Sequence, residues 1–295
     1  MTAPYEIEGT NAHPMDGRGM SAVEESLIRA RFEVLPLRGV AEQAAQFPLG
    51  TTVTVTASPR KGIEATIDLA VTLAALGLHA VPHLAARLIT GTAHLTALLS
   101  RLSEVGIDEV FVVAGDSPTP AGPFPDALSL LRRMDALGIR PGHVGITGYP
   151  ERHALIPDDA AIAAMADKSR HADYIVSQIC FEPRTIADWV TTIRSRGIGL
   201  PLYVGVPGAV DASKLLRISL RIGLGDSIRF LRKQHGVVGK MLSRYSPDTV
   251  VDDLAGYLGA AGYGIAGWHL FTFNEIAATL RWRYQAVQHH QEESA

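Results

Sequence analysis

Short apolar, β-branched runs recur along the chain, and segments with the apolar spacing of a helix separate them. Eight runs have the length and composition of strands: 31–35, 52–56, 80–84, 109–114, 144–148, 174–178, 202–206 and 267–272. One segment between them runs from Ile63 to Ala74, with its apolar residues on a single helical face. Another runs from Leu95 to Leu102, and Gly106 is expected to end it. A longer helical region, 211–262, is expected to hold two or three helices.

This order of elements predicts the fold class. Strands that alternate with helices over nearly the whole chain are typical of α/β proteins. Eight such units predict a (β/α)8 TIM barrel, as a single catalytic domain over 27–290 that follows an N-terminal arm, 1–26. A doubly wound open sheet is the alternative, but no Gly-x-Gly-x-x-Gly turn follows any strand. The arm is polar and rich in Gly, Pro and Asn, and we interpret it as a mobile or packing extension.

Composition limits the partners. The formal net charge of −3 argues against nucleic acid or an acidic membrane surface as the main partner. Cys180 is the only cysteine, so an intrachain disulfide is impossible, which suits a reducing cytoplasm. No run of about 18 apolar residues predicts a membrane span, and the N-terminus lacks the pattern of a secretory signal. We therefore expect a cytoplasmic protein with no membrane or nucleic-acid partner.

The first strand contains an unusual charge. Glu33 lies within the apolar run 30–36. A carboxyl group buried there without a partner would have a raised pKa and keep its proton near neutral pH. A general acid requires such a proton. The alternatives are a glutamate that faces outward, or a salt bridge to Arg31 or Arg38.

Other polar residues stand where the predicted strands end. Active sites of (β/α)8 barrels lie at the C-terminal ends of the strands. The candidates there are Glu33, Thr56, His83, Asp116, Tyr149, Gln178 and Asn274. Each alone could be a strand-end cap or a loop hydrogen bond, but their shared location favours one site. His289 and His290 have no third ligand near them in the sequence, so no metal site is expected.

Seven short motifs occur in order at these strand ends. They are Phe-Glu-Val-Leu-Pro at 32–36, Val-Thr-Val-Thr at 53–56, Pro-His-Leu at 82–84, Gly-Asp-Ser-Pro at 115–118, Gly-Tyr-Pro-Glu-Arg-His at 148–153, Ser-Gln-Ile-Cys-Phe at 177–181 and His-Leu-Phe-Thr-Phe-Asn at 269–274. Together they resemble the signatures of the methylenetetrahydrofolate reductase family, in its short bacterial type. Each motif is weak alone, and their common order makes the joint signal strong.

The resemblance implies an activity. It implies a flavoprotein oxidoreductase of one-carbon metabolism and methionine biosynthesis. Such an enzyme interconverts 5,10-methylenetetrahydrofolate and 5-methyltetrahydrofolate by hydride transfer through bound FAD, with NAD(P)H, NADH among them, as electron donor or acceptor. A homo-oligomer is also expected. By resemblance Glu33 and Asp116 are catalytic, and Gln178 binds the folate with them. The flavin contacts implied are Thr56, His83, Gly115, Asp116, Tyr149, His153 and Lys168.

The chain also departs from the family pattern. Ala114 and Glu275 stand where the family has arginines, Ala212 where it has an aromatic residue, and His171 where it has a glycine before the sixth strand. The stretch 57–62 replaces a Gly-rich one. These departures leave the flavin and the electron donor open. The alternatives are a flavin-independent reductase with direct hydride transfer from NAD(P)H, or a non-catalytic folate- or flavin-binding barrel. His83 could also be a structural histidine, and Lys168 a solvated helix residue.

Overall fold

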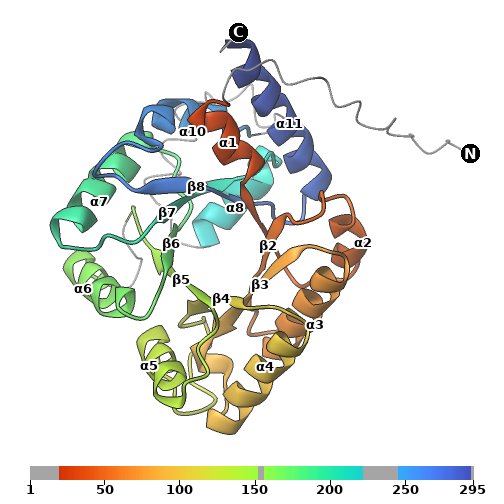
Figure 1. Ribbon diagram of the computed structural model, residues 1–295, viewed down its shortest axis with the longest axis vertical. Coiled ribbons are helices and arrows are strands. Elements are labelled where there is room, and N and C mark those ends of the chain that lie inside the picture. Colours follow the sequence, from red (N-terminus) through yellow and green to blue (C-terminus); the bar gives the residue numbers. More distant parts are fainter. Residues whose placement is uncertain (1–19, 152–155, 222–244, 294–295) are drawn as a thin grey trace, which may run out of the picture.

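The protein is described by a computed structural model that covers residues 20–151, 156–221 and 245–293. Eight parallel strands form a closed barrel in chain order, and β8 pairs with β1 (Figure 1). The strands are β1 (Arg31–Val34), β2 (Thr52–Val55), β3 (His79–Ala85), β4 (Glu109–Val113), β5 (His143–Gly148), β6 (Tyr174–Ser177), β7 (Leu202–Pro207) and β8 (Ile265–Phe271). The predicted (β/α)8 barrel is confirmed, with every strand within two residues of its expected bounds. The open-sheet alternative is wrong.

Helices surround the barrel. They are α1 (Ala22–Ile28), α2 (Val40–Ala44), α3 (Gly62–Ala75), α4 (Thr92–Glu104), α5 (Ala127–Leu137), α6 (Asp158–Ser169), α7 (Pro183–Ser195), α8 (Ala212–Arg221), α10 (Asp248–Leu254) and α11 (Ile276–Glu293), with short 3₁₀ turns at Ala86–Leu88 and Ala255–Tyr257. The predicted helical faces of α3 and α4 are buried, and Gly106 follows α4 with a φ of 77°. Of the region 211–262, the described residues form α8 and α10, and 222–244 lie outside them.

Alternation along the strands decides which side chains enter the barrel. On β1, Phe32 and Val34 are fully buried in the main hydrophobic core between barrel and helices. Arg31 and Glu33 alternate with them and therefore point to the interior. All strands run the same way, so their C-terminal ends form one rim, here called the mouth, and their N-terminal ends form the base. Arg31 lies nearer the base and Glu33 nearer the mouth.

A buried ionic network fills the interior near the base. Arg31 forms an ion pair with Glu109 of β4, and its Nη2 donates to the hydroxyl of Tyr174 on β6 at 2.9 Å. His79 Nε2 lies 2.7 Å from the second carboxylate oxygen of Glu109. The guanidinium stacks over the rings of Tyr174 and Tyr203, at 4.5 and 4.8 Å from their centres. Burial alone would raise the pKa of Glu109, but His79 and Arg31 hold it at about 2. The base is thus closed by paired charges.

The helix α1 packs on the outside of the barrel beside α11 and β8. Trp268 Nε1 of β8 donates to Ser26 Oγ at 2.8 Å, and Gln291 Nε2 of α11 donates to Glu24 Oε1 at 2.6 Å. These contacts anchor residues close to the predicted boundary at 26. The arm proper, residues 1–19, lies outside the described residues, so the domain boundary stays a prediction.

No described helix combines the length and the apolar character needed to cross a bilayer. The same part of the chain contains no group of three or more His, Cys, Asp or Glu side chains arranged to hold a metal ion.

Candidate active site

Three side chains from three strands meet inside the barrel toward the mouth. Glu33 Oε2 lies 3.2 Å from His269 Nε2 of β8 and 3.5 Å from His83 Nε2 of β3. The side chains of Glu33 and His83 are only 13% and 10% exposed, and that of His269 is 2% exposed. The alternation of β1, β3 and β8 turns all three inward. The sequence therefore places a carboxyl group and two imidazoles in one shielded cluster.

Burial sets the protonation of this cluster. Loss of solvation raises the pKa of Glu33 to about 7, against a smaller opposing effect of His83. Burial lowers the pKa of His83 to about 4 and that of His269 to about 3. Near pH 7 both histidines are therefore neutral, and Glu33 is close to half protonated. The Glu33–His269 contact is thus a hydrogen bond to a neutral imidazole, not a salt bridge.

The alternatives considered for Glu33 are wrong. Its side chain does not face outward. Among the described residues it forms no salt bridge with Arg31, which pairs with Glu109, and none with Arg38. His269 is not among the site residues predicted from the sequence. The alternation of β8, which puts Gly267, His269 and Phe271 on one face, is a signal that could have found it. The contact between His269 and Glu33, however, depends on the pairing of β8 with β1, which sequence alone does not give.

The end of β8 fixes the end of β1. Asn274 Oδ1 accepts from the backbone N–H of Leu35 at 2.8 Å, and Asn274 Nδ2 donates to the Leu35 carbonyl at 3.2 Å. Thr272 Oγ1 donates to the Glu33 carbonyl at 2.6 Å. Asn274 adopts the left-handed conformation, with a φ of 64°, which asparagine tolerates better than most residues. Asn274 is thus a clamp that positions the strand carrying Glu33.

The other predicted residues of the mouth follow their strands directly. Thr56 is half-buried after β2 and donates its N–H to the Val34 carbonyl at 3.0 Å. Gln178 follows β6, and its Oε1 accepts from its neighbour's N–H at 2.9 Å. Asp116 is exposed after β4. Tyr149 follows β5, and its pKa is raised by burial and by the charge of Asp116. These side chains therefore line one rim of the barrel, and Asp116 and Tyr149 are close enough to interact.

The turn after β4 requires its glycine. Gly115 has a φ of 87°, and a Cβ there would lie 3.0 Å from the Ala85 Cβ. Arg87 holds this turn: its N–H donates to the Ala114 carbonyl at 3.0 Å and its Nη1 to the Ser117 carbonyl at 3.0 Å. The Gly-Asp turn is thus built into the rim rather than free in solvent.

One predicted flavin contact, Lys168, does not lie at a strand end. Lys168 lies in the last turn of α6, in the outer layer, where burial lowers its pKa against the opposing charge of Asp126. His153 lies outside the described residues. His171, one of the departures, pairs with Asp135 just before β6, at the base. It therefore lies at the opposite end of the strand from the rim.

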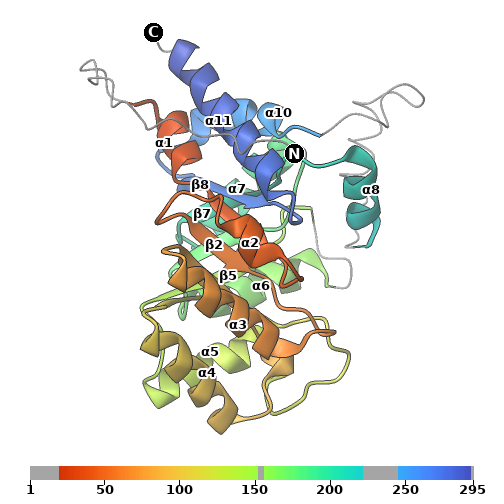
Figure 2. The same cartoon turned by 90° about the vertical axis from the view of Figure 1, so that its right-hand side faces the viewer.

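Helix α8 lies over the mouth. Figure 2 shows α8 beyond the strand ends. Lys214 Nζ of α8 lies 2.7 Å from Glu275 Oε1 and donates to the Phe273 carbonyl at 3.1 Å. Leu215 is fully buried in a small cluster with Phe271 and other residues that follow β6 and β8. Glu275, which stands where the family has an arginine, is thus used to attach this helix.

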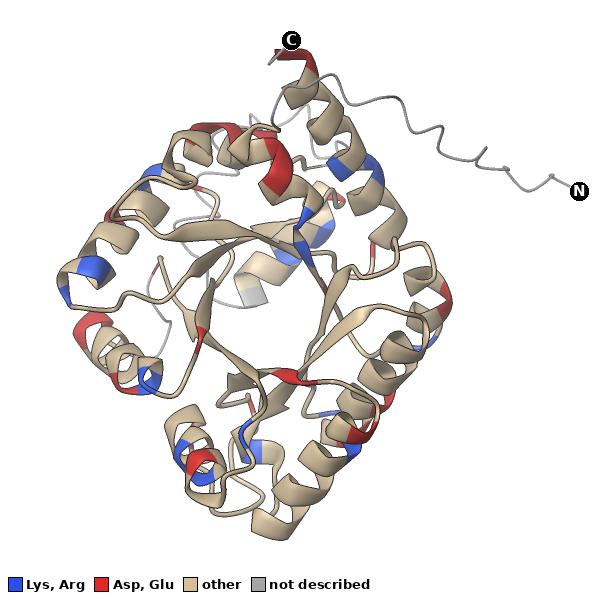
Figure 3. Ribbon diagram, in the orientation of Figure 1, with Lys and Arg blue, Asp and Glu red and all other residues tan. Residues whose placement is uncertain are grey.

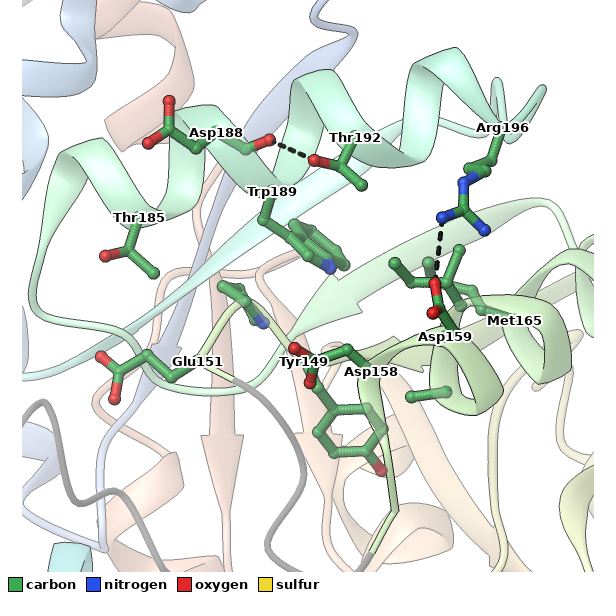
Figure 4. A pocket seen from close by; sticks show the side chains of 13 residues that line it. Tyr149, Glu151, Asp158, Asp159, Met165, Thr185, Asp188, Trp189, Thr192 and Arg196 are labelled. Atoms are coloured by element: carbon green, nitrogen blue, oxygen red, sulfur yellow. Dashed lines mark hydrogen bonds and ion pairs between the residues drawn. The ribbon is translucent and has the colours of Figure 1, made fainter.

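A cavity of about 480 Å³ lies between α6 and α7, with Tyr149 on its edge. Trp189 forms its floor, and the tyrosine ring points away from it (Figure 4). An Arg196–Asp159 ion pair of 3.0 Å crosses its outer end. Glu33 is not among its lining residues, so this cavity is separate from the interior cluster.

The fold and this cluster define a (β/α)8 barrel with a shielded carboxyl group at the end where such barrels bind their substrates. The family model for methylenetetrahydrofolate reductase matches residues 38–221, more than half of the chain. The chain therefore belongs to the methylenetetrahydrofolate reductase family, as its motifs predicted. Membership of this family supports a folate-related oxidoreductase activity for the chain.

Solved structures are similar in fold. One is described as an uncharacterized protein from Clostridium thermocellum that binds two copies of 5-methyl-5,6,7,8-tetrahydrofolic acid. The TM-score is 0.58 at 13% identity, covering 90% of this chain and 97% of that chain. A structure of concanavalin B gives a TM-score of 0.47 at 11% identity, covering 89% of this chain and 99% of that chain. At such identities the likeness concerns the barrel fold alone.

Proposed function

We propose that this protein interconverts 5,10-methylenetetrahydrofolate and 5-methyltetrahydrofolate, with Glu33 as the general acid. The observation that carries the proposal is the shielded Glu33 carboxyl, which keeps a proton near pH 7 and lies between two neutral histidines. The Clostridium thermocellum protein of similar fold binds 5-methyl-5,6,7,8-tetrahydrofolic acid, which is consistent with this substrate class.

The chemistry explains why an acid is needed. The five-membered ring of methylenetetrahydrofolate opens to a cationic iminium before its methylene carbon accepts hydride. Glu33 gives its proton to the departing nitrogen as the carbon–nitrogen bond breaks, so the ring nitrogen leaves neutral. The ionised Glu33 then accepts a hydrogen bond from His269 Nε2, which stabilises it until it is protonated again. One proton and one hydride are consumed for each methyl group formed.

Two residues of the rim act on the same substrate. The Asp116 carboxylate is an anion at the mouth, and it lowers the energy of the cationic iminium. The Gln178 side chain both donates and accepts hydrogen bonds, which suits the mixed donor and acceptor edge of a pterin. Its Oε1 accepts from the Ile179 N–H, so the Nε2 group is the part oriented to donate to a ligand. These roles follow the family resemblance and the position of both residues at the mouth.

The rim also offers groups for a flavin. The Thr56 hydroxyl, the Tyr149 phenol and the Gly115 backbone are donors to a ring edge, and exposed Arg60 and Lys61 are cations suited to a pyrophosphate. We therefore propose FAD as the cofactor. When bound and reduced by NAD(P)H, it supplies the hydride. The protein residues contribute binding, orientation and the proton.

A second candidate is direct hydride transfer from NAD(P)H without flavin. Ala114 favours it, because it leaves the end of β4 without the cation that the family resemblance leads us to expect there. This departure weakens the proposed flavin site and leaves the acid Glu33 in place.

One experiment separates these candidates. The visible spectrum is recorded for the purified protein, then after addition of FAD and removal of the excess, and folate reduction is assayed with NADH and NADPH in both samples. Flavin absorbance together with flavin-dependent turnover supports the FAD route. Turnover without flavin absorbance in either sample rejects it and establishes direct transfer. No folate turnover under any condition rejects the proposed function.

A further inference from the structure

A second cavity, of about 560 Å³, opens at the base of the barrel, at the opposite end from the mouth. Its walls come from the segment between α1 and β1, the segment before β2, and from β7 and α11 (Figure 1). Arg29, Arg31 and Arg283 line it. No aspartate or glutamate is among the described residues that line it. Figure 3 shows basic residues of α11 beside the start of β1. We call this cavity the base pocket.

Arg283 is the least compensated of these cations. It is half-buried on α11, and its guanidinium lies 5.4 Å from the ring centre of Phe32. Within the described part of the chain, no carboxylate pairs with it, and burial lowers its pKa. A partly desolvated guanidinium stacked on a ring is held in place and retains donors for an anion.

Arg31 adds a second, more deeply buried cation beside the same pocket. Its Nη2 is used by Glu109 and Tyr174, but its Nε is buried without a hydrogen-bond partner. Buried guanidinium nitrogens are rarely left unpaired, because the missing hydrogen bond costs free energy. Arg29 is more exposed and pairs with Glu25 at 3.1 Å. The Nε of Arg31 has almost no accessible surface, so Arg31 adds positive charge behind the wall, and the unused donors that face the pocket are those of Arg283.

The rim of the base pocket is apolar. Leu49 is 83% exposed, Tyr284 66% and Ile28 44%, and all three line the cavity. Exposed apolar side chains that cluster around a concavity mark a binding surface more often than scattered ones do. A cationic interior with an apolar rim fits a ligand that has an anionic head and an apolar body.

We propose that the base pocket binds a small organic anion, a phosphate or carboxylate on an apolar, ring-sized body, at a site independent of the folate site. The volume matches that of ordinary small-molecule sites. The anion lies against Arg283, whose planar guanidinium gives two-point recognition. The apolar body contacts Leu49 and Tyr284.

Isothermal titration calorimetry of the full chain tests this site. Phenyl phosphate and benzoate are the two anionic probes, inorganic phosphate lacks the apolar body, and phenol lacks the charge. We expect saturable binding of at least one anionic probe in the millimolar range or tighter, and weaker binding of phenol and inorganic phosphate. The stronger of phenyl phosphate and benzoate identifies the head group.

Paired variants locate the binding. Arg283→Gln is expected to weaken binding about tenfold or more, which corresponds to the loss of a charged hydrogen-bonded contact. Arg281→Gln, which changes an exposed arginine on the same helix, leaves binding within about twofold of the wild type. If Arg283→Gln does not fold, Arg283→Lys replaces it in the test. Lysine keeps the charge but loses the planar two-point contact, so weaker probe binding is still expected. Glu33→Gln binds the probe as the wild type does, because the two sites lie at opposite ends.

Several results would overturn the proposal. They are no saturable binding of either anionic probe, equal binding of phenol, or equal weakening by Arg281→Gln and Arg283→Gln. Sedimentation velocity tests the competing possibility that a second copy of the chain covers this face. If Leu49→Asp dissociates an oligomer, the face is a subunit interface, and the ligand proposal fails.

Discussion

The Oε2 atom of Glu33 lies 3.2 Å from the Nε2 atom of His269, and the two residues come from the strands that close the barrel. Closure thus creates the contact on which the proposed chemistry depends. A protonated Glu33 donates to this nitrogen in the Nδ1–H tautomer of His269, and an ionised Glu33 accepts from it in the Nε2–H tautomer, so a neutral imidazole serves both states. A charged partner would instead have held Glu33 ionised and removed the acid.

Replacing the carboxyl group tests the acid directly. Glu33→Gln keeps the shape of the side chain and loses the proton, so we expect folate turnover to fall by about 10²- to 10⁴-fold. Reduction of the cofactor by NAD(P)H, if flavin is bound, changes little. Steady-state assays and circular dichroism measure both activity and folding. The exposed Glu104 at the end of α4 provides the control, as Glu104→Gln. Near-normal turnover in the Glu33 variant would remove Glu33 from the mechanism.

The raised pKa of Glu33 predicts the pH dependence of folate reduction. Because the acid must be protonated, we expect kcat/KM for the folate to fall as the pH rises through about 7, by about tenfold per pH unit above it. The histidines do not contribute a limb near neutrality, since their pKa values lie at about 4 and about 3. Initial rates over a pH range that brackets neutrality, at constant ionic strength, measure this profile. A rate that rises with pH through neutrality would contradict it.

The sequence predicts the fold more completely than it predicts the contacts of the site. Periodicity predicts the eight strands because each strand's burial pattern is local, and the apolar setting of Glu33 predicts its raised pKa. His269 and the Arg31–Glu109 pair depend on which strands face one another across the closed barrel, which is not local. Lys168 rests on the family resemblance alone, and its position at the end of α6 places it in the outer layer.

Asn274 provides a test of positioning. Its side chain bonds both backbone groups of Leu35, so Asn274→Ala removes two hydrogen bonds and leaves alanine at a positive φ. We expect a loss of about 2–4 kcal/mol in stability and a fall in kcat larger than the change in KM. Urea denaturation and steady-state kinetics measure the two effects. Asn274→Gly, which fits the backbone conformation, separates strain from lost hydrogen bonds. If glycine restores full activity, the clamp does not position Glu33.

Asp116 is expected to act on the folate rather than on the cofactor. Asp116→Asn keeps the size of the side chain and removes the charge that stabilises the iminium, so the folate half-reaction should slow more than reduction by NAD(P)H. Stopped-flow measurement of the two half-reactions gives the comparison. Asp253→Asn, at an exposed position of α10, is a control for a lost charge outside the strand-end turn. Equal slowing of both half-reactions would show that Asp116 has only a general role.

The ionic network at the base predicts a strong dependence of stability on Arg31. Arg31→Met leaves the buried Glu109 carboxylate with only His79 and Tyr174, and removing one partner of such a pair costs about 3–5 kcal/mol. The wild-type pKa of Glu109 is lowered from 4.5 to about 2, so its contribution is present above pH 4.5 and is lost as the pH falls toward 2. The destabilisation in the variant should therefore be largest at neutral pH and shrink on acidification.

The double variant Arg31→Met/Glu109→Gln, which has no buried charge left unpaired, should recover most of the loss at neutral pH. Thermal and urea denaturation of all three variants, including Glu109→Gln alone, measure this cycle. If the double variant is no more stable than Arg31→Met, the loss comes from packing of the arginine between Tyr174 and Tyr203 and not from the unpaired charge of Glu109.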